Sequence, residues 1–260
     1  MNKEINGVNL SFSQYGCGRG KVLLLHGWGG DSSLMKPVAD ALQSSFQVLI
    51  PDLPGHGRSG RPPQPWGVPD YAECIRELID STGFSPCHVI AHSFGCRIAT
   101  YLAAQSPSLF ERIVFTGAAG IRPPQSAEAQ KRTLRYKKLK GICDKAKIIP
   151  GLNLAAEKFE NKLRRKYGSS DYNALDENMK KTFVKIINQD LSDMYEKFCS
   201  STLLIWGSND TETPLWMAKE MEKKIPDAGL IVFEGGSHFA YLEQISRFNT
   251  IVLHYLKGDE

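Results

Sequence analysis

The sequence has little of what marks a secreted, metal-bound or membrane-spanning chain. Its 260 residues include six cysteines, none at a spacing typical of metal ligands, and a chain this long needs no disulfide framework. We therefore expect reduced thiols that mostly fill the core, and no metal site. No apolar stretch approaches the roughly 20 residues that span a bilayer. The opening MNKEINGVNLSF has no apolar run after its charges, which argues against a secretory signal and favours a cytoplasmic protein.

Positive and negative side chains are also nearly balanced in number, with a net charge of +4, but they are unevenly distributed along the chain. Residues 121–196 contain 17 Lys and Arg against 10 Asp and Glu, a net of +7, which leaves −3 for the remainder. The most basic run is KRTLRYKKLKGICDKAK at 131–147. Aromatic side chains for base stacking are nearly absent there, since Tyr136 is alone. We interpret the run as a solvated helix face and expect no nucleic-acid partner, with attraction of anionic substrates as the alternative.

Short apolar runs and helical patterns alternate on both sides of residues 121–196. The predicted strands are 8–16, 21–27, 46–52, 87–93, 112–117, 201–207 and 229–235. The predicted helices are 33–43, 71–80, 96–105, 214–225 and 240–256. Such alternation implies an α/β fold with a doubly wound, mostly parallel sheet and helices on both faces.

Residues 121–196 interrupt this alternation. They are polar and basic, with helical stripes such as Phe159, Leu163 and Tyr167. We therefore predict a core formed by 1–120 and 197–260, and a helical insertion over 121–196.

The stretch VIAHSFGCR at 89–97 places Ser93 between a predicted strand and a predicted helix. In the pattern small-x-Ser-x-Gly, the serine sits on a tight turn with strained backbone angles, where Ala91 and Gly95 must be small. The pentapeptide alone is a weak signal, because an ordinary serine at a strand end would match it by chance. Its position between strand and helix makes Ser93 a candidate nucleophile.

A serine hydroxyl needs a base, and His238 is the best placed of the six histidines. It lies in EGGSHFAYLE, after the last strand, in a loop that opens at the same sheet edge as Ser93. The base needs an orienting acid, and Asp210 follows the strand 201–207 at that edge, with Glu212 as its competitor. The predicted catalytic residues are therefore Ser93, Asp210 and His238 in chain order.

The oxyanion of an acyl-transfer intermediate also needs donors. The backbone N–H of Phe94 follows from the turn at Ser93. The loop HGWGG at 26–30 places Trp28 where its N–H can serve as the second, and His26 then reads as a structural histidine that holds this loop.

Five stretches together resemble the α/β-hydrolase superfamily, in its lid-bearing, esterase-like branch. They are LLLHGWGG, PDLPGHGRSG, VIAHSFG, LLIWGSND and GGSHFAYLE. The resemblance covers 21–120 and 200–256 and implies the α/β-hydrolase fold, a Ser-His-Asp triad at the residues above, an oxyanion hole at Trp28 and Phe94, no cofactor, and a lid at 121–196. It also makes DLPGHGRS at 52–59 a scaffold loop, with Gly55 and Gly57 in unusual backbone conformations.

The resemblance implies a cofactor-independent serine hydrolase that acts on a small-molecule carboxylic ester or thioester. Carbon–carbon bond hydrolysis or perhydrolysis with the same triad is an alternative, and a non-catalytic small-molecule receptor on the same fold is another. Phe239 stands where carbon–carbon hydrolases of the superfamily tend to have Trp, which weakens that alternative. Ser93 argues against the dehalogenase and epoxide-hydrolase branches, which have Asp there.

Overall fold

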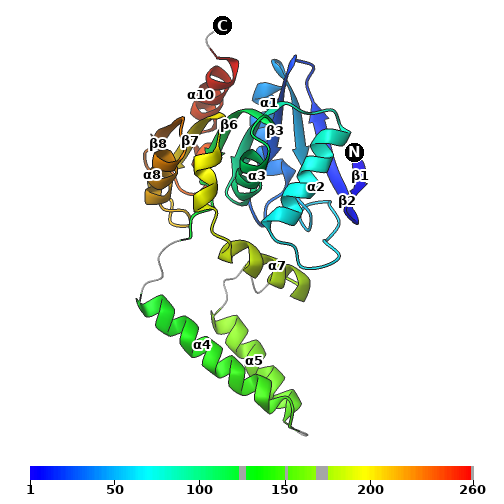
Figure 1. Cartoon of the computed structure of the whole chain (residues 1–260), viewed down its shortest axis with the longest axis vertical. Coiled ribbons are helices and arrows are strands. Elements are labelled where there is room, and N and C mark those ends of the chain that lie inside the picture. Colours follow the sequence, from blue (N-terminus) through cyan, green and yellow to red (C-terminus); the bar gives the residue numbers. More distant parts are fainter. Residues whose placement is uncertain (123–126, 150–151, 168–174, 259–260) are drawn as a thin grey trace. The chain divides into compact units, whose positions relative to one another are not determined.

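The computed structural model describes residues 1–122, 127–149, 152–167 and 175–258, and its centre is an eight-stranded sheet (Figure 1). In the order β1-β2-β4-β3-β5-β6-β7-β8, the strands are β1 (Asn2–Ile5), β2 (Val8–Tyr15), β4 (Phe46–Pro51), β3 (Gly20–Leu25), β5 (Cys87–His92), β6 (Phe110–Thr116), β7 (Ser201–Gly207) and β8 (Ala228–Phe233). β2 pairs antiparallel with β1 and β4, and the pairs from β4 to β8 are parallel. The predicted doubly wound, mostly parallel sheet is confirmed, and β1 is a strand that the sequence pattern did not predict.

Helices cover both faces of the sheet. On one face lie α2 (Val68–Ser81), α3 (Phe94–Gln105), α8 (Leu215–Lys224) and the 3-10 helix η2 (Ser192–Lys197); on the other lie η1 (Ser32–Met35), α1 (Lys36–Leu42), α9 (Ala240–Glu243) and α10 (Ile245–Lys257). The predicted helix over 240–256 is thus divided at Gln244.

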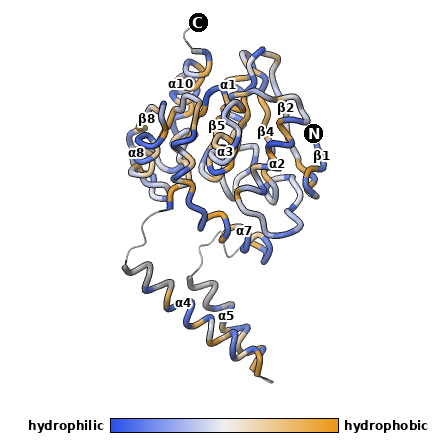
Figure 2. The backbone as a smooth tube through the Cα atoms, viewed as in Figure 1, coloured by the Kyte–Doolittle hydropathy of each residue, from blue (hydrophilic) through white to orange (hydrophobic). Residues whose placement is uncertain are grey.

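The core follows from the two-residue period of the strands. Leu23 and Leu25 of β3 pack into the cluster on the α2 side, whereas Val22 and Leu24 pack into the cluster on the α1 side. Hydrophobic colours therefore run along central strands such as β4 and β5, while α2 and α3 carry both hydrophobic and polar colours (Figure 2). A sheet buried on both faces needs such continuous apolar strands.

Helix α2 shows how the local sequence determines where a helix begins. Its predicted stripe is buried, and the helix begins three residues before the predicted start at Tyr71, because the backbone N–H of Gly67 donates to the Asp70 carboxylate at 2.6 Å. Pro69 lies in the first turn, where its missing N–H costs no helical hydrogen bond.

The chain divides into two compact units, one of Met1–Arg122 with Val184–Glu260 and one of Pro123–Phe183. In the second unit α4 (Ala127–Ala146) packs against α5 (Asn153–Tyr167), and Lys147 forms an ion pair with Glu160. Helix α7 (Glu177–Asn188) contains the boundary.

Residues 184–196, which fall in the predicted insertion, belong to the first unit. Leu191 donates its N–H to the carbonyl oxygen of Gly120 at 2.9 Å, and Tyr195 is fully buried. The assignment of 121–196 as a lid stays a prediction. In the described part of the chain, no helix combines the length and the apolar character needed to cross a bilayer.

Candidate functional site

Ser93 lies between β5 and α3 with φ 50° and ψ −109°, a conformation that side-chain-bearing residues rarely adopt. The neighbouring chain is close: a Cβ added to Gly95 would lie 2.6 Å from the carbonyl oxygen of Leu25. The turn thus requires a residue without a side chain at 95. Ser93 itself is half-buried, so its hydroxyl is not sealed in the core.

The loops after β7 and β8 bring Asp210 and His238 together. Asp210 Oδ2 lies 2.8 Å from His238 Nδ1, and both side chains are buried. Because a carboxylate oxygen accepts, Nδ1 carries the proton and Nε2 is left free to accept one.

Further donors hold the Asp210 carboxylate in place. Oδ1 accepts the backbone N–H groups of Glu212 and Thr213, each at 2.9 Å, and Oδ2 accepts the Thr213 hydroxyl at 2.8 Å. Burial alone would raise the pKa of Asp210, but its hydrogen bonds to His238 and Thr213 outweigh burial and lower it. Asp210 is therefore an anion that fixes the tautomer of His238.

Contacts through the loop after β6 connect Ser93 to His238. Ser93 N–H donates to the Thr116 carbonyl at 3.1 Å, and the Ser93 carbonyl accepts from Ala119 N–H at 3.2 Å. Gly117 (φ 50°) lies in the chain between Thr116 and Ala119. It approaches the His238 ring so closely that an added Cβ would lie 3.0 Å from Nδ1. The structure therefore brings the three residues predicted as a triad to one edge of the sheet.

Trp28 and Phe94, the predicted oxyanion-hole residues, are also neighbours. Their rings meet edge to face with centroids 5.3 Å apart, and a Cβ at Gly27 would lie 3.2 Å from Ser93 Cβ. The loop after β3 thus reaches the turn at Ser93, which is consistent with the predicted roles. Donation by the two backbone N–H groups stays a prediction.

His26 has the structural role expected of it. Its Nε2 accepts the Leu53 N–H at 2.9 Å, and its Nδ1 lies 2.8 Å from the Gly27 carbonyl. Burial lowers the pKa of His26, so the ring is neutral and joins the loops after β3 and β4.

Asp52 organises the loop that the sequence identified as scaffold. Its carboxylate accepts the backbone N–H groups of Ser32 at 2.8 Å and Arg58 at 3.0 Å. Gly55 and Gly57 have φ of 82° and 52°, as predicted. An added Cβ at Gly57 would lie 2.5 Å from the Asp52 carboxyl carbon, so this turn also needs glycine.

Sequence reasoning treated Glu212 only as a competitor of Asp210 for Nδ1. In the structure its Oε2 instead faces the other ring nitrogen, at 3.7 Å from His238 Nε2, and its side chain is 68% exposed. The spacing of two residues after Asp210 was the available signal, but it did not reveal which nitrogen Glu212 would approach.

The cysteines show no reactive environment at this site. All six are free thiols, and burial raises the pKa of Cys96, three residues from Ser93, so this thiol is a poor nucleophile. Within the described ranges, no three His, Cys, Asp or Glu side chains are grouped as metal ligands would be.

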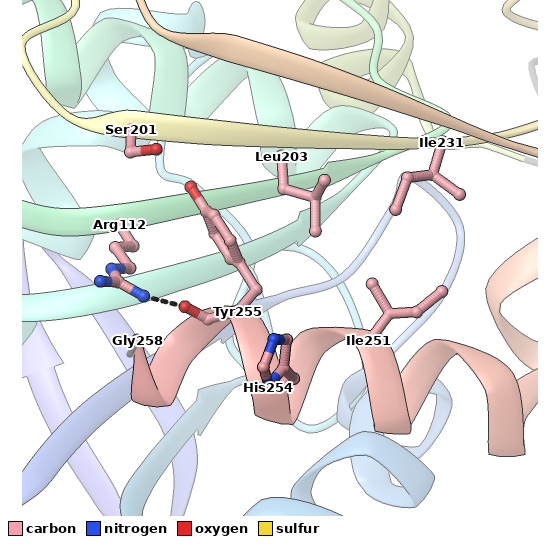
Figure 3. Close-up of a pocket in the computed structure, with 8 residues that line it drawn as sticks. All are labelled: Arg112, Ser201, Leu203, Ile231, Ile251, His254, Tyr255 and Gly258. Carbon is pink, nitrogen blue, oxygen red and sulfur yellow. Dashed lines mark hydrogen bonds between the residues drawn. The ribbon is translucent and has the colours of Figure 1, made fainter. Parts of the chain in front are cut away.

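A hollow of about 510 Å³ lies between the sheet and α10 (Figure 3). It is lined by Arg112, Ser201, Leu203, Ile231, Ile251, His254, Tyr255 and Gly258. Arg112 and Ser201 are at the starts of β6 and β7, whereas Ser93 follows the end of β5. The Arg112 guanidinium already has partners within the chain. It donates a hydrogen bond to the Tyr255 carbonyl and lies 5.5 Å from the centroid of the Tyr255 ring. The hollow is thus separate from the site at Ser93.

Comparison with known proteins finds relatives that match almost the whole chain. A relative from Pseudomonas sp, a 2-hydroxy-6-oxononadienedioate/2-hydroxy-6-oxononatrienedioate hydrolase, is 26% identical and matches 97% of this chain and 93% of its own length. The solved esterase of Exiguobacterium antarcticum has a TM-score of 0.74 at 22% identity, over 98% of this chain and 97% of that one. The enol-lactonase of Burkholderia xenovorans LB400 has a TM-score of 0.75 at 20% identity, over 99% and 100%. These structural likenesses show a shared fold.

Two family models match the parts of the chain that build the sheet edge. The model described as alpha/beta hydrolase fold matches residues 21–142, which include Trp28, Ser93 and Phe94. The model described as TAP-like protein matches residues 188–259, which include Asp210 and His238. With the observed sheet order and the turn at Ser93, these matches establish that the chain belongs to the α/β-hydrolase superfamily.

Proposed function

We propose that this hydrolase cleaves a carboxylic ester or thioester through an acyl-enzyme on Ser93, without a cofactor. His238 Nε2 removes the proton from the Ser93 hydroxyl as Ser93 attacks the acyl carbon. The same nitrogen then donates this proton to the leaving oxygen or sulfur. Water, deprotonated by His238, attacks the acyl carbon, and the proton passes from His238 to the Ser93 oxygen as the acid is released.

One observation carries the proposal: the buried hydrogen bond of 2.8 Å between Asp210 and His238 at the edge where Ser93 sits in its strained turn. A neutral imidazole with its Nδ1 proton held by a carboxylate is the base that serine activation requires. The N–H groups of Trp28 and Phe94 would stabilise the oxyanion, and the close approach of the loop at Gly27 to Ser93 supports this role.

Residues 121–196 are proposed as a lid that restricts which small molecules reach Ser93. Their net charge of +7 supports a preference for substrates that carry an anionic group on the acyl side.

Carbon–carbon bond hydrolysis is the second candidate, because the relative from Pseudomonas carries the name of a hydrolase of a dienedioate. The triad chemistry is compatible with both bonds. Phe239 favours the ester, because carbon–carbon hydrolases of the superfamily tend to have Trp at this position. Its ring packs edge to face against the His238 ring, with centroids 5.5 Å apart.

A fluorophosphonate probe tests the nucleophile. We expect it to label Ser93 in the wild-type protein and nothing in Ser93→Ala, which should also lose ester hydrolysis. Labelling of another residue would exclude Ser93 as the nucleophile, and no labelling of the folded protein would favour a non-catalytic receptor. Product analysis with matched ester and vinylogous diketone substrates separates the two hydrolytic candidates.

A further inference from the structure

Glu212 is a second carboxylate at the proposed base, on the side opposite Asp210. Its Oε2 lies 3.7 Å from His238 Nε2, beyond hydrogen-bond distance. Nε2 is the nitrogen that would pass the proton to the leaving group, so the carboxylate borders the space into which the leaving group departs.

The loop fixes the backbone of Glu212 and leaves the charge of its side chain available. Asp210 accepts the backbone N–H of Glu212 at 2.9 Å, which fixes the start of its side chain. For the described residues, His238 is the one basic side chain within 4 Å of the Glu212 carboxylate. With 68% of the side chain exposed, the carboxylate is accessible to a bound molecule.

We propose that Glu212 is a specificity-determining residue that selects esters with a cationic leaving group, such as an amino alcohol. The inference rests on the proposed function, and it adds the chemical class of the leaving group. Glu212 does not define the acyl group, because it lies beside Nε2, where the leaving group departs, whereas the acyl carbon is attacked by Ser93.

Simple geometry sets the range over which the charge acts. A leaving oxygen within about 3 Å of Nε2 receives its proton. An ammonium group two carbons from that oxygen then comes within a few ångströms of Oε2, where a pair of opposite charges attract even in a high dielectric. An anionic group at the same place is repelled. Phe239, 38% exposed and in contact with the same imidazole, provides apolar surface for the carbon groups around the ammonium.

The test compares butyrylcholine, the butyrate ester of choline, with its uncharged isostere, in which a tert-butyl group replaces the trimethylammonium group. The quantity measured is the ratio of kcat/KM for the cationic ester to kcat/KM for the neutral one. We expect Glu212→Gln to lower this ratio about tenfold, as the loss of one charge at this distance predicts. Any effect of the lost charge on the His238 imidazolium acts on both esters alike, so it cancels in this ratio.

Two variants serve as controls. Glu212→Asp retains the charge and should retain most of the ratio. Glu77→Gln removes the same charge from an exposed position on α2 and should leave the ratio unchanged. Added salt should lower the wild-type ratio and leave that of Glu212→Gln nearly constant, because salt screens an exposed charge.

The outcomes distinguish this inference from the proposed function. If Ser93 is labelled and both esters are hydrolysed, but Glu212→Gln leaves the ratio unchanged, the role of Glu212 is wrong and the hydrolase stands. If wild-type protein hydrolyses neither ester and the probe does not label Ser93, both are overturned.

Discussion

His92 Nε2 lies 3.0 Å from the carbonyl oxygen of His238, so the residue that precedes the proposed nucleophile holds the backbone of the proposed base. The carbonyl accepts, and Nε2 therefore carries the proton while Nδ1 does not. Burial and the neighbouring His238 lower the pKa of His92 to about 3. The neutral ring fixes the loop after β8 against the strand that leads to Ser93.

We predict that acid destabilises the fold well before its carboxylates are protonated. Burial lowers the pKa of His56 to about 4 and of His92 to about 3, and it also lowers the pKa of His26 and His88. In the unfolded chain each histidine binds a proton at about pH 6.5. The stabilisation from a neutral buried ring is therefore fully present above about pH 6.5, and it is lost as the pH falls toward the pKa of that histidine in the folded protein. Each such group contributes about 1.4 kcal/mol per pH unit over its interval.

Urea denaturation between pH 4 and 8 measures this effect, and the free energy of unfolding should decline from about pH 6.5 downward with a slope steeper than one group gives. A free energy that stays constant down to about pH 5 would show that these rings are accessible to protons in the folded protein.

The second prediction ranks the two carboxylates near His238. Asp210→Asn should lower the rate on a neutral ester by about a thousandfold to ten thousandfold, because an amide favours the wrong imidazole tautomer. Glu212→Gln should change that rate little, since Glu212 makes no hydrogen bond to the ring. Single-turnover kinetics with a chromogenic neutral ester give both numbers. The reverse ranking would assign the orienting role to Glu212.

Much of this site could be predicted from sequence because strand ends locate side chains. A parallel sheet collects the residues after its strands at one edge, so Ser93, Asp210 and His238 could be grouped from three separate loops. The direction of an exposed side chain has no such constraint. The approach of Glu212 to Nε2 depends on the turn that Asp210 organises, and the hydrogen bond from His92 crosses 146 residues of chain.

Boundaries were harder to predict for a related reason. Residues 184–196 are polar in pattern, like the rest of the insertion, yet the structure places them in the first unit. Arg97 of α3 donates to the Gln189 carbonyl at 2.7 Å, and Tyr195 is buried. Such long-range contacts between a polar segment and the core leave no periodic signal in the sequence.

The third prediction concerns the strain at Ser93. A side-chain-bearing residue in this conformation costs on the order of 1–3 kcal/mol. Ser93→Gly removes the Cβ that causes the strain, so it should raise the free energy of unfolding by about 1 kcal/mol after the extra chain entropy of glycine is subtracted. Ser93→Ala keeps the Cβ and should change stability little. Thermal denaturation compares the two inactive variants, and equal stability would mean that the turn is unstrained.

The last prediction concerns the basic insertion. A substrate with a carboxylate on its acyl side should be hydrolysed with a higher kcat/KM than its neutral isostere, because the positive charge of residues 121–196 accelerates its association. Charge reversal at Lys137, Lys138 and Lys140 should narrow this difference, and so should salt, with a screening length of about 10 Å at 0.1 M. The control reverses three exposed lysines of the first unit, Lys197, Lys219 and Lys257, and thus changes the net charge of the chain equally. If both sets of reversals act alike, the effect belongs to net charge. If neither acts, the basic run is a solvated helix face without a role in substrate capture.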